Sequence, residues 1–206
     1  MSNDMRLSLL PLLASLAGAL PAAADTILSD VTGNWAAPQN NGFYYRAVLS
    51  QDGDYLRLRL YEGMAADGLP TEPTFDNPKI AYASTRPGAK DWLEVAPDGQ
   101  LLLNGLTVNE SHVYSDRLSI RHMDNQITVM GFATYNNGPD AVASMPDDPF
   151  TCWGTNCYSC VADVWEGLSV VGGKPYTRID AAFEAINAAI WTPDTIYELG
   201  LCPAPD

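Results

Sequence analysis

The stretch Gly42 to Glu62 reads GFYYRAVLSQDGDYLRLRLYE and decides the fold class. Asp52-Gly53 lies between two runs in which apolar and polar residues alternate. Asp-Gly is a strong signal for a two-residue type I′ turn, because that turn needs positive φ at both central positions. The stretch therefore predicts a β-hairpin.

Asp52-Gly53 as the turn fixes a register for this hairpin. Side chains alternate along a strand, so one face is expected to lie against the core. Its cross-strand pairs are Leu49 with Leu56, Ala47 with Leu58 and Tyr45 with Leu60. The pairs of the opposite face are Val48 with Arg57, Arg46 with Arg59 and Tyr44 with Tyr61. Two arginines opposite each other repel, so this register requires carboxylates, water or an anionic ligand nearby.

Two turns after the first hairpin define the middle of the chain. Trp92–Ala96 and Gln100–Asn104 flank Pro97-Asp98-Gly99, which is a typical turn sequence. Asn104-Gly105 has the form of another type I′ turn, which would pair Leu103 with Leu106.

A third clear hairpin is expected around Asp124-Asn125. Its register places Leu118 and Ile120 on one face and Arg117 and Arg121 on the other. Before Pro149 the chain holds about eight to ten strands at short spacing, which is typical of an antiparallel β-sandwich or an up-and-down barrel. The fold class is therefore mainly β.

Thr32-Gly33-Asn34-Trp35 carries a G-x-W pattern ahead of a series of strands. This resembles the first strand of lipocalin- and avidin-type barrels, the calycins, on the residues Gly33 and Trp35. The resemblance implies an up-and-down barrel in which the tryptophan closes one end and a ligand fills the other. The later markers of that family are not recognisable in the chain, and we interpret Trp35 as a core aromatic.

The N-terminus has the pattern of a secretory signal peptide. Arg6 precedes the apolar run Leu7 to Leu20, and Ala22-Ala23-Ala24 supplies the small residues of a cleavage site. Cleavage after Ala24 would remove residues 1–24 and leave a periplasmic or extracellular protein without a transmembrane segment. Asp4 is unusual before the apolar run, so translation from Met1 and translation from Met5 both stay open.

The chain has a formal net charge of −14 at pH 7. Residues 1–24 contain one acid and one base, so their removal leaves this charge unchanged. Such a charge argues against nucleic acid and anionic membranes as partners, and it is compatible with a cationic partner. The expected partner is an unknown protein or a small-molecule ligand, and the oligomeric state stays open.

Asn136 to Pro149 is the best boundary in the chain. It divides an antiparallel β domain, residues 25–149, from a helical and disulfide-bridged segment, residues 150–206, that packs on it. Apolar residues at helical spacing predict an amphipathic helix from Arg178 to Trp191, after a capping box at Thr177 to Asp180. A short second helix is expected over Pro193 to Leu199, ended by Gly200.

Four cysteines, Cys152, Cys157, Cys160 and Cys202, form an even set in a chain expected to be exported. This predicts two disulfides, for which we favour one local bridge within Cys152 to Cys160 and one long bridge to Cys202. The long bridge would close a loop of about forty residues and add about 2–4 kcal/mol of stability. Thiol–disulfide catalysis at Cys157-Tyr158-Ser159-Cys160 and zinc binding by the four cysteines are the alternatives.

Candidate ligand-binding side chains come from the faces opposite the apolar ones. They share basic or aromatic character and are Tyr44, Arg46, Arg57, Arg59, Tyr61, Arg117 and Arg121. If these faces line a barrel, they would bind an anion such as a carboxylate or a phosphate. If they point outward, they form a solvated surface paired with acids, which we favour because arginine is seldom buried without a partner.

No sequence motif for catalysis, phosphate binding, haem attachment or metal binding is present. His112 and His122 are the only histidines. We therefore predict no cofactor, no metal and no catalytic residue, and whether the protein is an enzyme stays open. The favoured function is a non-catalytic binding or interaction protein. A carrier of small anions and a hydrolase-type enzyme with a spatially assembled site are the alternatives.

Overall fold

The computed structural model describes residues 25–35, 43–143, 147–153, 156–178 and 186–204. Its strands form two antiparallel sheets, one of four strands and one of seven. The four-stranded sheet consists of β1 (Thr26–Asn34), β2 (Tyr44–Asp52), β3 (Tyr55–Gly63) and β4 (Phe75–Tyr82). The seven-stranded sheet consists of β5 (Lys90–Val95), β6 (Leu101–Val108), β7 (Val113–Met123), β8 (Gln126–Asn137), β9 (Cys157–Asp163), β10 (Leu168–Val171) and β11 (Lys174–Arg178).

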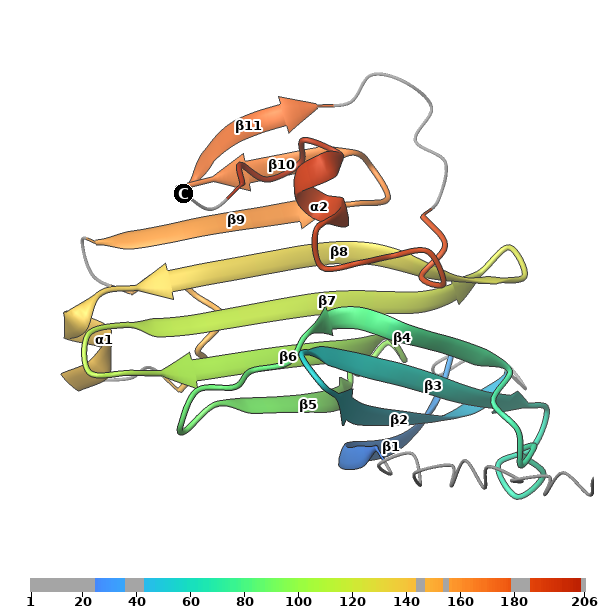
Figure 1. Cartoon of the computed structure of the whole chain (residues 1–206). Helices are drawn as coiled ribbons and strands as arrows, with labels where there is room; N and C mark the ends of the chain where they lie inside the picture. The colour runs from blue at the N-terminus through green and yellow to red at the C-terminus, as the bar shows by residue number, and fades with distance from the viewer. Residues whose placement is uncertain (1–24, 36–42, 144–146, 154–155, 179–185, 205–206) are drawn as a thin grey trace, which may run out of the picture.

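The two sheets differ in size, and the smaller one lies across only part of the larger (Figure 1). The described residues also contain two short helices, α1 (Pro139–Ala143) and α2 (Thr195–Glu198). Helix α2 lies over the larger sheet beyond the end of the smaller one (Figure 1). These two sheets confirm the mainly β fold class and favour the sandwich over a closed barrel.

The core lies between the two sheets and contains the predicted apolar face of the first hairpin. Its six residues, Tyr45, Ala47, Leu49, Leu56, Leu58 and Leu60, are all fully buried. They pack against the face of the seven-stranded sheet that carries Leu103, Leu118 and Ile120, which we name the inner face. Trp35 is also in the core, where it stacks on Tyr45 at 4.0 Å between ring centroids, as expected of a core aromatic.

The predicted register of the first hairpin is wrong by two residues. Leu49 lies opposite Leu58, and Arg46 lies opposite Tyr61, so no two arginines face each other. The turn is Gly53-Asp54 rather than Asp52-Gly53, and only Gly53 has a positive φ, of 61°. Glycine at the first central position is typical of a type II′ turn, which is the other favoured turn of two-residue hairpins. A shift by two keeps every side chain on its predicted face.

The predicted turn at Asn104-Gly105 is also wrong, because β6 continues through both residues. Gly105 pairs with Asp91 of β5 and with Asp116 of β7, so β6 is a central strand. The other two turns are confirmed by their backbone angles. Gly99 has φ 84°, and Asp124 and Asn125 have φ 50° and 63°, as a type I′ turn requires.

The predicted helix over residues 178–191 is contradicted where the structure describes it. Arg178 ends strand β11, and residues 179–185 lie outside the described residues. Residues 186–191 are not helical, because their backbone pairs with β8. Val129 donates to the carbonyl of Ile186 at 2.9 Å, and Ala188 donates to that of Ile127 at 2.7 Å. β9 pairs with β8 only from Gly131 onward, which leaves this part of the β8 edge free for residues 186–188.

The C-terminal segment is therefore joined to the β domain by backbone pairing. β9 lies beside β8 in the same sheet, although residue 149, the predicted boundary, separates them in sequence. The short second helix is confirmed as α2, with Gly200 at φ 70° after it. No helix in the described residues is long and apolar enough to cross a membrane. The predicted signal peptide lies outside the described residues.

The disulfides follow the predicted pattern of one local and one long bridge. Cys152 is bonded to Cys157, and Cys160 is bonded to Cys202 across 42 residues of sequence. The long bridge attaches the chain after α2 to β9, and both of its cysteines are buried. Such bonds are consistent with an oxidising environment.

The two bridges should contribute unequally to stability. A chain-entropy treatment gives about 4 kcal/mol for the Cys160–Cys202 loop and about 2 kcal/mol for the Cys152–Cys157 loop. We expect the double variant Cys160→Ala/Cys202→Ala to lose more free energy of unfolding in urea titrations than Cys152→Ala/Cys157→Ala. If both double variants lose the same free energy of unfolding, the long bridge does not stabilise the protein by restricting the unfolded chain.

Candidate functional site

The arginines predicted as ligand-binding residues do not meet in one cavity. Arg46, Arg57 and Arg59 lie on the face of the four-stranded sheet opposite its core face. Arg46 binds Asp30 at 2.5 Å, Arg57 binds Asp76 and Asp25, and Arg59 binds Asp25. The hydrogen bond from Arg57 also lowers the pKa of Asp76. These three side chains are already paired with acids.

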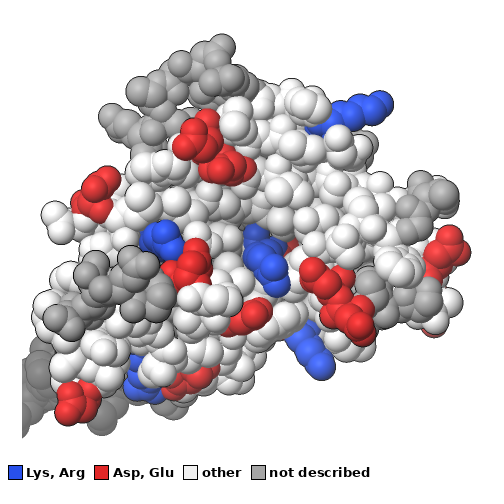
Figure 2. Space-filling model, turned by 180° about the vertical axis from the view of Figure 1, so that it is seen from behind, with Lys and Arg blue, Asp and Glu red and all other residues white. Residues whose placement is uncertain are grey.

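The two arginines of β7 lie on the outer face of the other sheet. Arg121 binds Asp98 at 2.8 Å, and Arg117 donates to Asn104 at 2.7 Å and lies 3.8 Å above the ring of Phe150. In the view from behind, basic side chains are scattered and most of them lie beside acidic ones (Figure 2). This arrangement agrees with the outward orientation that we favoured from the sequence.

The predicted tyrosines and the two histidines are also dispersed. Tyr61 packs under Arg46 at 5.7 Å, and Tyr44 lines a separate small cavity of about 420 Å³. His122 contacts Glu62 at 2.8 Å, and His112 contacts Ser111 at 2.8 Å. In the parts of the chain that the structure describes, no group of His, Cys, Asp and Glu side chains is arranged to hold a metal ion.

A groove that the sequence did not reveal lies on the inner face of the seven-stranded sheet, beyond the edge of the smaller sheet. Along each central strand, inward residues change from apolar in the core to polar in the groove. The inward-facing residues are, in order from the core to the groove, Leu103, Gly105 and Thr107 on β6, Leu118, Asp116 and Tyr114 on β7, and Phe132, Thr134 and Asn136 on β8. The polar half of the inner face is the floor of the groove.

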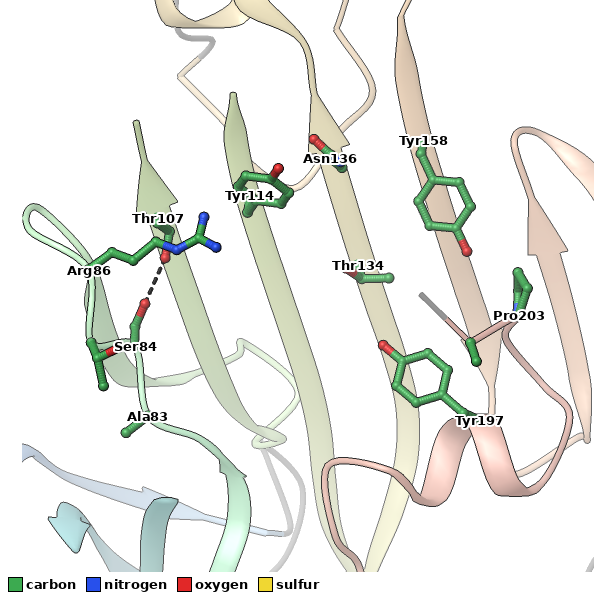
Figure 3. Close-up of a pocket in the computed structure, with 12 residues that line it drawn as sticks. Ala83, Ser84, Arg86, Thr107, Tyr114, Thr134, Asn136, Tyr158, Tyr197 and Pro203 are labelled. Carbon is green, nitrogen blue, oxygen red and sulfur yellow. Dashed lines mark hydrogen bonds between the residues drawn. The ribbon is translucent and has the colours of Figure 1, made fainter. Parts of the chain in front are cut away.

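The groove has two adjoining cavities of about 870 Å³ and about 500 Å³, and both are lined by Tyr197 and Ala204. One wall is the segment 83–86 between β4 and β5, and the other is α2 with residues 203–204 (Figure 3). Cys202 lies between α2 and residues 203–204, so the long disulfide holds this wall against β9. We name the larger cavity the hydroxyl end and the smaller one the acidic end.

Two carboxyl groups meet across a glycine at the acidic end. Asp91, Gly105, Asp116 and Thr134 occupy directly opposite positions on β5, β6, β7 and β8. A Cβ atom on residue 105 would lie 3.3 Å from the Asp91 carboxylate oxygen and 4.0 Å from Asp116 Cβ. Glycine therefore leaves the space into which the Asp91 carboxyl leans toward Asp116.

Both carboxyl groups have raised pKa values. For Asp116 the largest cause of the raised pKa is desolvation by the surrounding protein; a hydrogen bond from Thr134 opposes it, and the charge of Asp91 adds a smaller increase. For Asp91 desolvation also dominates, and the backbone N–H of Ser84, 3.1 Å from its carboxylate, partly compensates. Asp116 nevertheless has an exposed surface in the groove, so its desolvation by the surrounding protein is only partial and a ligand can reach it.

Two more acids and several aromatic rings surround this pair. The hydroxyl of Tyr82 donates to both carboxylate oxygens of Asp194 at 3.0 Å, which links β4 to the start of α2. Glu198 contributes a fourth carboxyl group, and Phe132, Trp191 and Tyr197 contribute rings. The residues that line the acidic end include no lysine, arginine or histidine. The described residues that line this cavity are thus acidic, aromatic or apolar, with no basic side chain among them.

The segment that carries Trp191 is fixed by one buried amide. Asn77 of β4 donates from Nδ2 to the carbonyl of Ala188 at 2.6 Å and to that of Trp191 at 2.8 Å. Its Oδ1 accepts from the backbone N–H of Lys79 at 2.7 Å. Both Asn77 and Trp191 are buried. The wall of the acidic end is therefore held by hydrogen bonds to the smaller sheet as well as by the disulfide.

The hydroxyl end is lined mainly by neutral polar groups. Ser84 and Thr107 share a hydrogen bond of 2.7 Å, and Arg86 lies 5.7 Å from the ring centroid of Tyr114 (Figure 3). Tyr158 and Tyr197 place their rings on the opposite side (Figure 3). Burial raises the pKa of Tyr197 to about 12.

Comparison of the chain with known protein families, with curated proteins and with solved structures finds no match. Geometry and chemistry of the groove are therefore the basis for a functional assignment.

The raised pKa of Asp116 leads to a prediction about stability. Because this pKa is higher in the folded chain than in the unfolded one, ionisation of the carboxyl group opposes folding. The stability that the neutral form supplies is present below the unfolded-state pKa of about 3.9 and is lost as the pH rises through the folded-state value. We expect Asp116→Asn, which keeps an acceptor for Thr134, to be more stable than the native protein at pH 7.

The measurement is urea unfolding at a series of pH values. The advantage of Asp116→Asn should shrink as the pH falls toward about 4. Asp67→Asn, in the exposed loop between β3 and β4, is the matched control and should change the free energy of unfolding little at any pH. A variant that is less stable at pH 7, or an advantage independent of pH, would contradict the assigned cause.

Proposed function

We propose that this protein is an exported, non-catalytic binding protein that holds an organic cation, an ammonium or a guanidinium group, at the acidic end of the groove. The observation that carries the proposal is the lining of this cavity. Asp91, Asp116, Asp194 and Glu198 supply four carboxyl groups beside aromatic rings, and no basic side chain lies among the lining residues.

Electrostatics support a cationic ligand. Desolvation raises the pKa of both Asp91 and Asp116, and the charge of Asp91 adds a smaller increase to the pKa of Asp116. A bound cation would favour their charged forms and so offset the cost of ionising them. The net charge of −14 would in addition raise the concentration of cations near the groove.

Aromatic rings support an organic cation rather than a metal ion. An ammonium or guanidinium group is attracted to the face of Trp or Tyr, and this attraction is stronger where water is excluded. Tyr82, Trp191 and Tyr197 lie around the same cavity as the carboxyl groups. Its volume of about 500 Å³ lies within the usual range for small-molecule sites.

The alternative of an anion carrier has less support from the geometry. The five arginines on which it depended are paired with acids or with Asn104 and face away from the groove. Binding of an anion there would first have to break those contacts. The carboxyl groups at the acidic end, by contrast, have no basic side chain beside them among the lining residues, so a cation would not have to displace one.

Binding of choline tests the proposal. We expect choline to bind in isothermal titration calorimetry, and its neutral tert-butyl analogue, which has the same shape without the charge, to bind at least about tenfold more weakly. Asp116→Asn should weaken choline binding by about tenfold or more, because it removes one carboxylate of the pair. Affinity should fall as the pH is lowered and the carboxyl groups become protonated.

Matched variants separate the groove from the general acidity of the surface. Asp67→Asn removes one surface charge outside the groove and should leave choline affinity within about twofold. Tyr197→Leu removes a ring of the acidic end and should weaken binding while the carboxyl groups remain. If choline and its neutral analogue bind equally, or if Asp67→Asn costs as much as Asp116→Asn, the proposal is wrong.

A hydrolase is a second candidate function, favoured by the Asp91–Asp116 pair. A carboxylic acid with a raised pKa can donate a proton to a leaving group, and two carboxyl groups across a groove are the catalytic set of glycosidases. A panel of nitrophenyl glycosides distinguishes the two functions. Turnover that disappears in both Asp91→Asn and Asp116→Asn would favour the enzyme, whereas saturable choline binding without turnover favours the binding protein.

A further inference from the structure

The hydroxyl end of the groove has a chemical character opposite to that of the acidic end. The residues that line it include Arg86 and no acid. Arg86 forms no ion pair with any residue that the structure describes, whereas Arg46, Arg57, Arg59, Arg117 and Arg121 each have a carboxylate within 4.0 Å. Its guanidinium group instead lies 5.7 Å from the ring centroid of Tyr114, and the side chain extends from the wall across the floor of the groove (Figure 3).

Hydroxyl groups accompany Arg86 at this end. Ser84, Thr107, Tyr114, Tyr158 and Tyr197 supply them from the segment before β5, from three strands of the sheet and from α2. Tyrosine hydroxyl groups are protonated at neutral pH and can donate a hydrogen bond to a ligand. A guanidinium group together with hydroxyl donors is a set that binds a carboxylate or a phosphate.

The two ends belong to one groove and are close enough for one small ligand. Both are lined by Tyr197, Thr134 lines the hydroxyl end, and Asp116, directly opposite it, lines the acidic end. Tyr114 and Asp116 are two residues apart on β7, which places their Cα atoms about 7 Å apart along the strand. A ligand that binds at Asp116 therefore extends naturally toward Arg86.

We propose that the ligand is a small zwitterion, with its cationic group between Asp91 and Asp116 and its anionic group at Arg86. This inference rests on the proposed function, because it takes the site of the cation from there, and it adds the class of ligand. Because the Cα atoms of Tyr114 and Asp116 are about 7 Å apart, the two charges of the ligand should be separated by a flexible chain of at least about that length.

Pairs of probes test the inference by calorimetry at pH 7. They are ω-aminobutanoate, ω-aminohexanoate and ω-aminooctanoate, each compared with the simple alkylamine that lacks the carboxylate. At least one zwitterion of this series should bind about fivefold or more tighter than its amine. Hexanoate, which lacks the ammonium group, should bind more weakly than both ω-aminohexanoate and its simple alkylamine.

Variants assign the gain to Arg86. Arg86→Gln should abolish the advantage of the zwitterion and leave the affinity of the simple amine within about twofold. Arg121→Gln, an arginine outside the groove, should preserve the advantage. Circular dichroism and urea unfolding of both variants verify that the fold is intact.

The outcomes separate this inference from the proposed function. Suppose that choline and the amines bind but no zwitterion of the series binds more tightly than its amine, or that Arg86→Gln keeps the advantage of the zwitterion. Then the assignment of a zwitterionic ligand is wrong, and the proposed cation site is retained. If neither choline nor any amine binds, the cation site is wrong and the zwitterion assignment falls with it.

Discussion

Burial of the leucine face of β2 and β3 against the seven-stranded sheet is the constraint on which the rest of the structure depends. Four strands cannot cover the inner face of seven, so the apolar residues of the larger sheet stop where the smaller sheet ends. Beyond that line the same strands carry Gly105, Asp116 and Thr134 in the positions that leucines would occupy in the core. The groove is thus a direct result of two sheets of unequal size.

Much of the fold follows from local pattern. Alternation in the first hairpin identifies its buried face, because a shift of register by two residues does not change which side a residue faces. Local pattern predicts the wrong element where pairing with a neighbouring strand determines the backbone conformation. Asn104-Gly105 has the sequence of a turn but lies between two partner strands, and Ile186 has helical spacing but lies in a segment whose backbone pairs with β8.

The groove could not be predicted in the same way. Asp91 and Asp116 are far apart in sequence, and only the registers of β5 with β6 and of β6 with β7 bring them together. One signal was present, namely a glycine that interrupts the inward alternation of leucines on β6, since such a glycine marks a close approach. The disulfides were predictable because cysteine count and compartment limit the pairings, and the arginines were conspicuous in sequence but are paired in the structure.

The Cys160–Cys202 bond also bears on the rigidity of the groove. Cys160 lies directly opposite Thr134, so the crosslink lies in the same cross-strand row as Asp116, two strands away from it. On this side α2 is held at both ends, because Asn77 binds the carbonyls of Ala188 and Trp191 before it and the disulfide holds Cys202 after it. The wall that α2 forms is therefore a fixed part of the groove and not a hinged segment.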